Sequence, residues 1–120
     1  MEKKKTLRLR KNDIELLAVL KAHIETLLEP IPTIKELSKK FGINTDKLKK
    51  GFKQLYGKPL HRYHLEFKME VAKKLLAETD HSIDVIAAQF GYNDANNFSA
   101  AFRKVTGKRP GEWRNFSIRK

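Results

Sequence analysis

The feature that most constrains the fold of this chain is an internal repeat. The stretches TIKELSKKFGINTDKLKKGFKQLYGK and SIDVIAAQFGYNDANNFSAAFRKVTGK share hydroxyl, apolar, Phe-Gly, Asn and Gly-Lys positions in the same order. The matched positions are Thr33 with Ser82, Ile34 with Ile83, Leu37 with Ile86, Phe41-Gly42 with Phe90-Gly91, Asn44 with Asn93, and, after one extra residue, Leu48 with Phe98, Phe52 with Phe102 and Gly57-Lys58 with Gly107-Lys108. Each copy has a helix-start residue, an apolar face at helical spacing and a glycine between two short segments. Each therefore predicts a helix-turn-helix, and two copies in register make a chance match improbable.

The local signals inside both copies indicate where the helices begin and end. Thr33 and Glu36 form a Thr-x-x-Glu capping box, and Asn44 is placed to cap the next helix. That helix is expected to bury Leu48, Phe52, Leu55 and Tyr56. In the second copy Ser82 caps one helix, and Asn93 or Asp94 caps the next, whose core residues are Phe98, Phe102 and Val105.

Further helices are predicted around the two copies. Ahead of the first copy, a helix is predicted after a cap at Asn12 or Asp13, and Pro30 and Pro32 end it. The residues at helical spacing are Ile14, Leu17, Ala18, Lys21, Ile24, Leu27 and Leu28, with the aliphatic stem of Lys21 at the edge of the apolar stripe. Between the copies, a helix runs from the turn containing Pro59 to about Ala77, and its wide apolar arc indicates partners on two sides. Pro110 begins a final turn that holds Trp113.

No segment alternates with the period of a strand, so the predicted fold is all-α with about seven helices. The expected organisation is a basic lead-in or linker without core residues over 1–12, a first helix-turn-helix subdomain over 13–57, a linker helix over 58–79 and a second helix-turn-helix subdomain over 80–120.

The composition favours a polyanion as the partner. Lys and Arg number 26 against 14 Asp and Glu, which gives a formal net charge of +12. Nucleic acid is the first candidate partner and an anionic membrane surface is the second. The third possibility is a basic protein that binds neither.

The absence of cysteine excludes disulfides, thiolate zinc sites and thiol nucleophiles. No apolar run approaches the ~20 residues of a membrane span, and the N-terminus lacks a signal-peptide pattern, so we expect a cytoplasmic, nucleoid-associated protein.

The most distinctive residues of the chain lie in its second half: Lys68-Met69, Ala72, Leu75-Leu76, Ser82-Ile83, Ile86-Ala87, Phe90-Gly91-Tyr92, Phe98, Phe102-Arg103, Gly107, Pro110 and Trp113-Arg114. With them the chain resembles, over about residues 13–114, the DNA-binding domain of the AraC/XylS family of bacterial transcription regulators. The resemblance implies two homeodomain-like units joined by a long central helix, with the third and sixth helices in major grooves. A spacer helix of about 18 residues is about 27 Å long, against about 34 Å between successive major-groove faces, so adjacent grooves of one duplex are the expected target.

Transferred by position, the resemblance assigns base contacts to Asp46, Lys49, Lys50, Ala95, Asn96, Asn97 and Ala100. The chemistry agrees, because Asn pairs with adenine, Lys with guanine, Asp accepts from cytosine and Ala meets a thymine methyl. Phosphate contacts are expected from Lys47, Lys53, Arg62, Arg103, Lys104, Lys108 and Arg109. For Asp46 a purely helix-stabilising role at the N-terminus is an equal alternative, and any of the basic or amide side chains could instead be simply solvated.

Two other classes of function compete with DNA recognition. His61 and His64 have a spacing that metal sites use, with Glu66 nearby, but the sequence places no third ligand and no nucleophile with a base and an orienting group. We therefore expect no catalytic residue, no metal and no cofactor. The stronger alternative is a basic module that binds a protein or a membrane surface, and it predicts no preference among DNA sequences.

The resemblance also bears on the protein as a whole. It implies a transcription regulator, more often an activator that contacts RNA polymerase than a repressor. Family members commonly carry a sensing domain ahead of this one, so we expect a C-terminal part of a larger ligand- or signal-responsive protein, with a short natural regulator as the alternative. This segment is expected to be a monomer on double-stranded promoter DNA.

Overall fold

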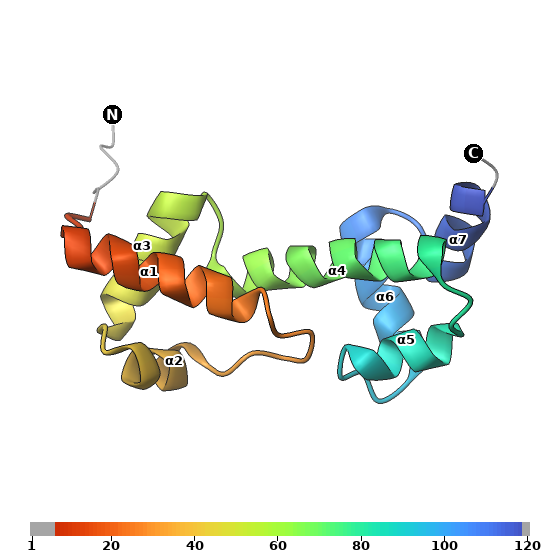
Figure 1. The fold of residues 1–120 in the computed structure, drawn as a ribbon, viewed down its shortest axis with the longest axis horizontal. Helices are drawn as coiled ribbons and strands as arrows, with labels where there is room; N and C mark the ends of the chain where they lie inside the picture. Colours follow the sequence, from red (N-terminus) through yellow and green to blue (C-terminus); the bar gives the residue numbers. More distant parts are fainter. Residues whose placement is uncertain (1–6, 119–120) are drawn as a thin grey trace. The chain divides into compact units, whose positions relative to one another are not determined.

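The computed structural model describes residues 7–118, which form seven α-helices and no strand (Figure 1). The helices are α1 (Lys11–Ile24), α2 (Ile34–Phe41), α3 (Thr45–Tyr56), α4 (Leu60–Glu78), α5 (Ile83–Gln89), α6 (Ala95–Thr106) and α7 (Pro110–Ile118). The all-α prediction and the order of the helices are confirmed. The first half of the expected lead-in, residues 1–6, lies outside the described residues.

The chain divides into two compact units, each with its own core. Among the described residues, the first unit contains those up to Leu27 together with Ile31–His64, and the second contains Leu28–Pro30 and those from Leu65 onward. Helix α4 supplies its first residues to one unit and the rest to the other. This sharing agrees with the wide apolar arc of α4, because each unit buries a different part of that helix.

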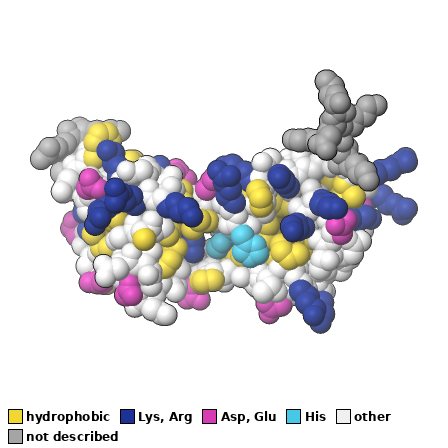
Figure 2. Space-filling view, turned by 180° about the vertical axis from the view of Figure 1, so that it is seen from behind, with side chains coloured by type: hydrophobic (Ala, Val, Ile, Leu, Met, Phe, Trp, Pro, Cys, Tyr) yellow, Lys and Arg dark blue, Asp and Glu magenta, His cyan; other side chains and the backbone are white. Residues whose placement is uncertain are grey.

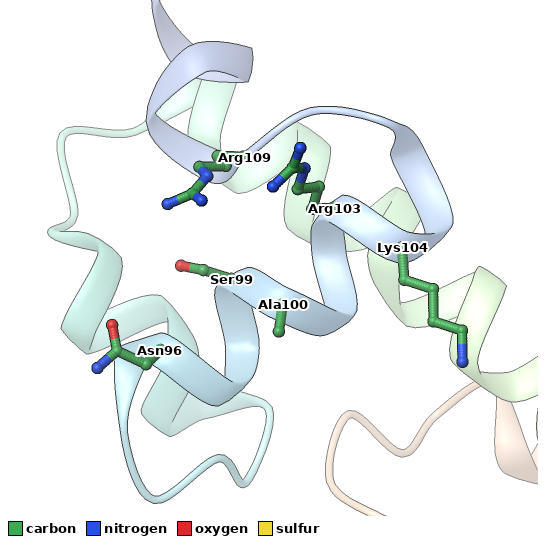
Figure 3. Close-up of a pocket in the computed structure, with 6 residues that line it drawn as sticks. All are labelled: Asn96, Ser99, Ala100, Arg103, Lys104 and Arg109. Carbon is green, nitrogen blue, oxygen red and sulfur yellow. The ribbon is translucent and has the colours of Figure 1, made fainter.

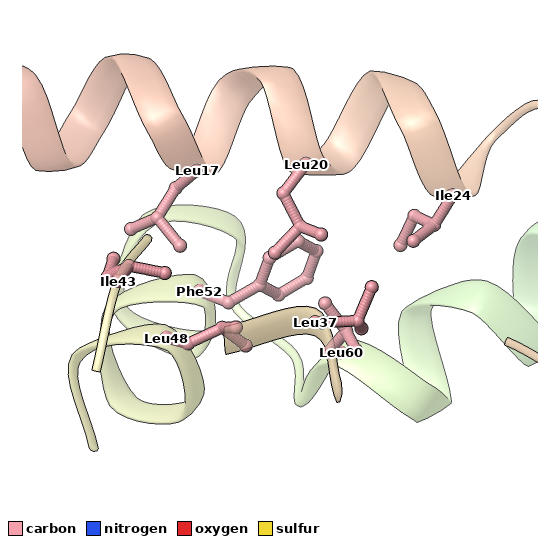
Figure 4. Close-up of a cluster of buried hydrophobic side chains, with 8 residues drawn as sticks. All are labelled: Leu17, Leu20, Ile24, Leu37, Ile43, Leu48, Phe52 and Leu60. Atoms are coloured by element: carbon pink, nitrogen blue, oxygen red, sulfur yellow. The ribbon is translucent and has the colours of Figure 1, made fainter. Parts of the chain in front are cut away.

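The core of the first unit is formed where α1 crosses the helix-turn-helix (Figure 4). Figure 4 shows Leu17, Leu20 and Ile24 of α1 directed toward Phe52, and all four side chains are fully buried. The cluster is completed by Leu37, Ile43, Leu48 and Leu60. Tyr56 and Tyr63 pack on Phe52, with ring centroids 4.8 and 5.5 Å away.

Helix α1 differs from its prediction in both its start and its buried face. It begins at Lys11 after the N-cap Arg10, because Asp13 in the first turn accepts a hydrogen bond from the Arg10 N–H at 2.9 Å. The buried face runs through Asp13, Leu17, Leu20 and Ile24, whereas Ile14 is 42% exposed and Ala18 is exposed. The prediction that Ile14 and Ala18 face the core was therefore wrong. The helix also ends at Ile24, well before Pro30, so the prediction that Leu27 and Leu28 belong to it was wrong.

Helix α3 contains a buried glycine and shows a second difference from its prediction. Gly51 is buried, and a Cβ atom at this position would lie 2.9 Å from Leu17 Cδ1 and 3.1 Å from Leu9 Cδ2. The missing side chain lets Leu17 of α1 and Leu9, which precedes α1, approach α3 closely at this position. Leu55, one turn further along the same face of α3, is 36% exposed. The expectation that Leu55 is buried was wrong. Leu9 packs against the core of the first unit, so the lead-in does contribute a core residue.

The second unit packs three helices around a row of aromatic rings. Met69, Ala72 and Leu76 of α4 contact Ile86, Ala87, Phe90, Phe98 and Phe102. The rings of Phe90 and Phe98 stack with centroids 6.0 Å apart and planes inclined by 3°. These contacts fix one face of α6 against the core, as its apolar spacing predicts.

Helix α7 fastens the end of α4 through two side chains that follow Pro110. Trp113 Nε1–H donates to the carbonyl of Lys73 at 3.1 Å. The guanidinium of Arg114 donates to the carbonyls of Leu76, Thr79 and His81 at 2.9, 3.2 and 2.6 Å. Because a helix leaves its last carbonyls without intrahelical partners, Arg114 supplies the donors that the end of α4 lacks.

The predicted caps are present at four helix starts. Thr33 and Glu36 form the reciprocal box, with the Glu36 N–H donating to Thr33 Oγ1 at 3.2 Å and the Thr33 N–H donating to Glu36 Oε1 at 3.0 Å. Asn44 and Ser82 cap α3 and α5, and Asp94 rather than Asn93 caps α6. None of the helices in the described part of the chain combines the length and the apolar character that a membrane crossing needs.

Candidate nucleic-acid interface

Helix α6 has a buried aromatic face and an exposed polar face. Phe98 and Phe102 are fully buried, so the residues half a turn away from them face outward. Asn96, Asn97, Ala100, Arg103 and Lys104 are all exposed, and Ala95 is half-buried. The helix itself contains no acidic residue, so its outward face carries amide, hydroxyl, methyl and cationic groups but no carboxylate.

The two asparagines at the start of α6 have different surroundings. The Asn97 N–H donates to Asp94 Oδ1 at 2.8 Å, and Asn97 Nδ2 lies 3.4 Å from Asp94 Oδ2. The Asn96 side-chain amide has no hydrogen-bond partner within residues 7–118. Asn96 therefore offers both a donor and an acceptor to a ligand, whereas the donor group of the Asn97 side chain is directed at the capping Asp94.

Six side chains surround an open hollow of about 600 Å³ beside α6 (Figure 3). Its lining brings together two predicted base contacts, three predicted phosphate contacts and one residue that the sequence reasoning missed: Asn96, Ala100, Arg103, Lys104, Arg109 and Ser99. Figure 3 shows Arg109, from the residue just before α7, beside Arg103 and the hydroxyl of Ser99. The signal for Ser99 was present in its spacing, because it stands one helical turn after Asn96 and one before Arg103.

Three residues predicted for the same interface do not line the hollow. Ala95 and Asn97 flank Asn96 but are not among the lining residues, and the Lys108 ammonium lies 5.2 Å from the ring centroid of Phe116. The assignments of these residues to bases or phosphates stay predictions.

Helix α3 presents a more strongly charged face than α6. Asp46, Lys49, Lys50 and Lys53 are exposed on it, opposite the buried Leu48 and Phe52. Lys50 Nζ lies 3.1 Å from Asp46 Oδ1, and about two thirds of each side chain is exposed, at 65% and 64%. An exposed pair of this kind contributes little to stability, so both groups can exchange their partner for a base edge at small cost.

Lys47 differs from the other lysines of α3. Its ammonium lies 3.1 Å from Asp13 Oδ2 of α1, and its side chain is 31% exposed. The Arg10 N–H and this ammonium hold the pKa of the Asp13 carboxyl below its ordinary value. Lys47 thus links α1 to α3 within the first unit, and a phosphate contact would have to share its ammonium with Asp13. Arg62, the remaining predicted phosphate contact, is exposed on α4.

Lys68, for which the sequence predicted no role, contacts the turn before α6. Lys68 of α4 is only 6% exposed, and its ammonium lies 4.8 Å from the ring centroid of Tyr92. Burial lowers the pKa of Lys68 and raises that of Tyr92. The cation–π contact stabilises the buried ammonium and ties the turn between α5 and α6 to α4.

The two histidines that suggested a metal site, His61 and His64, have different surroundings. His64 is 4% exposed, and its Nε2 lies 2.7 Å from the carbonyl oxygen of Leu27, to which it donates. His61 is exposed. Within residues 7–118, no three His, Asp or Glu side chains gather closely enough to hold a metal ion.

Lys and Arg side chains are spread over each unit on the face drawn in Figure 2. On this face cationic side chains therefore occur on both units, with Asp and Glu side chains among them. A surface of this kind attracts the phosphates of a nucleic acid and makes binding sensitive to salt.

Comparison with known proteins agrees with this arrangement. A family model described as a helix-turn-helix domain matches residues 37–115. Among curated proteins, the chain is 32% identical over 82 residues to the HTH-type transcriptional regulator YtdP of Bacillus subtilis, covering 68% of this chain and 11% of that protein. It is 38% identical over 72 residues to the HTH-type transcriptional activator RhaR of Yersinia pseudotuberculosis, covering 60% of this chain and 25% of that protein. The chain thus spans a quarter or less of the length of these two relatives.

Solved structures share the fold. The C-terminal domain of the two-component response regulator yesN from Fusobacterium nucleatum superposes with a TM-score of 0.72 at 32% identity, covering 87% of this chain and 99% of that chain. The DNA-binding domain of AdpA, determined in complex with a target DNA, superposes with a TM-score of 0.74 at 22% identity, covering 88% of this chain and 95% of that chain.

Proposed function

This chain belongs to the AraC-type helix-turn-helix family, and we propose that it binds double-stranded DNA sequence-specifically through α3 and α6 as part of a transcription regulator. One observation carries the proposal. The hollow beside α6 brings together an amide that no residue of 7–118 binds, a methyl group and three cations, two from α6 and one from Arg109. Amides and methyl groups discriminate among bases, and cations bind phosphates irrespective of sequence.

The two recognition helices divide the work between them in this proposal. On α3, Lys49 and Lys50 are exposed cations that attract the duplex and can bind guanine. On α6, Asn96 and Ala100 supply discrimination with little charge of their own. We propose that the helices enter major grooves one turn apart on the same duplex, so that one chain binds as a monomer.

We further propose that the protein activates transcription by contacting RNA polymerase, and that it joins this domain to a sensing part. The name of RhaR, a transcriptional activator, supports the first statement. The second is supported by the length of the relatives and by the response regulator yesN, of which a C-terminal domain shares this fold. A repressor would bind the same DNA without raising transcription, so transcription in vitro from a template carrying the bound site distinguishes the two.

Selection from a random duplex library tests the central proposal. We expect an enriched motif that spans two major grooves, with an affinity that falls by about 0.9 log unit per tenfold increase in salt for each phosphate neutralised. A basic module for protein or membrane surfaces would bind every duplex alike. Recovery of no motif from several rounds of selection at moderate salt would refute sequence-specific binding.

A further inference from the structure

We infer that α6 recognises the 5-methyl group of a thymine in the hollow above Ala100, next to an adenine that Asn96 binds. This inference rests on the proposed function, and it specifies the bases that the second unit requires. Its basis is the contrast between one short apolar side chain and the longer polar side chains around it.

Ala100 lines the hollow with the shortest side chain of the six lining residues. It is exposed, and the three basic residues that share the hollow have side chains several atoms longer than its single methyl group. A base edge that enters can therefore reach the Ala100 methyl while the phosphates on either side meet the cations. The surface that Ala100 contributes is apolar, and among the major-groove edges the thymine methyl is the apolar one.

Asn96 specifies the neighbouring position. It stands four residues before Ala100 on the same helical face, about 6 Å away along the axis. Successive bases of one strand are about 3.4 Å apart along the duplex, so the two side chains reach base pairs one or two steps apart. The Asn96 amide has no hydrogen-bond partner within residues 7–118, and its paired donor and acceptor match adenine N7 and N6.

The rest of the face disfavours the other bases at this position. Within α6 no carboxylate is available to accept from cytosine N4, and the capping Asp94 is bonded to Asn97. A cytosine above Ala100 would bring a polar amino group against a methyl and leave it without a protein partner. The cations that could bind guanine, Arg103 and Lys104, stand about one turn further along the helix and suit phosphates of the adjoining strand.

Removal of the methyl group alone tests the inference. Starting from the duplex that selection recovers, each thymine of the α6 half-site is replaced in turn by deoxyuridine, and binding is measured by fluorescence anisotropy. Burial of one methyl-sized group is worth a factor of about four in affinity, so one position is expected to bind about fourfold more weakly as deoxyuridine.

The protein variant Ala100→Gln completes the cycle. Glutamine is a good helix former that fills the hollow, so this variant should bind the thymine and deoxyuridine duplexes equally. Ala77→Gln, on an exposed alanine of α4, is the matched control and should keep the fourfold difference. Circular dichroism of both variants reports whether the fold is intact.

The outcomes separate this inference from the proposed function. A selected motif with no deoxyuridine position that weakens binding would overturn methyl recognition and leave sequence-specific binding standing. A fourfold effect that persists in Ala100→Gln would also overturn it, because the methyl would then contact another residue. The absence of any selected motif would overturn both.

Discussion

The turn between α5 and α6 provides a sharp test of the packing that positions the second recognition helix. Gly91 has a φ of +79°, and a Cβ atom added there would lie 2.7 Å from Pro30 Cδ and 3.4 Å from Glu29 Cβ. Gly107, after α6, has a φ of +85° with nothing within 4 Å of its added Cβ. The variants Gly91→Ala and Gly107→Ala therefore share the backbone cost and differ in the steric overlap.

The magnitudes follow from these two terms. An alanine in the left-handed region costs about 1–2 kcal/mol of unfolding free energy, and this cost applies to both variants. The overlap with the rigid ring of Pro30 adds about 1–3 kcal/mol for Gly91→Ala alone. The stabilisation that alanine gives by restricting the unfolded chain is common to both positions and cancels in the comparison. We expect Gly91→Ala to be the less stable variant by about 1–3 kcal/mol.

Urea unfolding followed by tryptophan fluorescence measures this difference in the free energy of unfolding of the second unit. Trp113 is the only tryptophan of the chain, and it packs against the core of the second unit, so its emission reports on that unit. Pro30→Ala should recover most of the excess loss in a Gly91→Ala background and should change Gly107→Ala by no more than it changes the native chain.

Equal losses for the two glycine variants would refute the reasoning. That result would mean that Glu29 and Pro30 do not pack on the turn as the structure places them. A failure of Pro30→Ala to restore stability would locate the strain elsewhere, since the ring of Pro30 supplies the closest atom.

Three further predictions concern binding and pH. Asn96→Ala should reduce the binding free-energy difference between the preferred base and the others at one position of the DNA site by about 1–3 kcal/mol, measured by repeated selection. Asn97→Ala should alter that difference less, because the Asn97 amide donates to the capping Asp94. Lys53→Ala should weaken binding to all sequences alike and lower the slope of log affinity against log salt by about 0.9, and a sequence-dependent loss would contradict a phosphate contact. Tyr63 donates a hydrogen bond to Glu25 and holds the pKa of this carboxyl below its ordinary value of 4.5. The ionised Glu25 therefore stabilises the fold above that pH, and this contribution is lost as the pH falls. Tyr63→Phe should flatten the decrease of the thermal midpoint on acidification, and an unchanged pH profile would exclude this role.

The sequence determined those parts of the structure that depend on neighbouring residues. The caps by Thr33, Asn44 and Ser82 were predictable because each joins groups only three positions apart. The repeat likewise predicted two helix-turn-helix units, and the spacing of Phe98 and Phe102 predicted which face of α6 is buried. These features need no knowledge of which helix packs against which.

The tertiary structure decided whatever depends on a partner distant in the chain. Helix α1 has more apolar residues than one face can bury, so periodicity did not reveal that Leu20 is buried and Ile14 is exposed. The reason lies in α3, where Gly51 admits Leu17 and Leu9 and fixes the rotation of α1.

The same limit applies to the candidate interface. Its individual residues on α6 were predictable from spacing and resemblance, but their grouping with Arg109 around one hollow depends on how the chain returns after α6. The pairing of Lys47 with Asp13 was likewise hidden, because it joins α3 to α1. Local hydrogen bonds can be read along a chain, whereas the choice among several apolar faces and several charged partners is made by packing between elements.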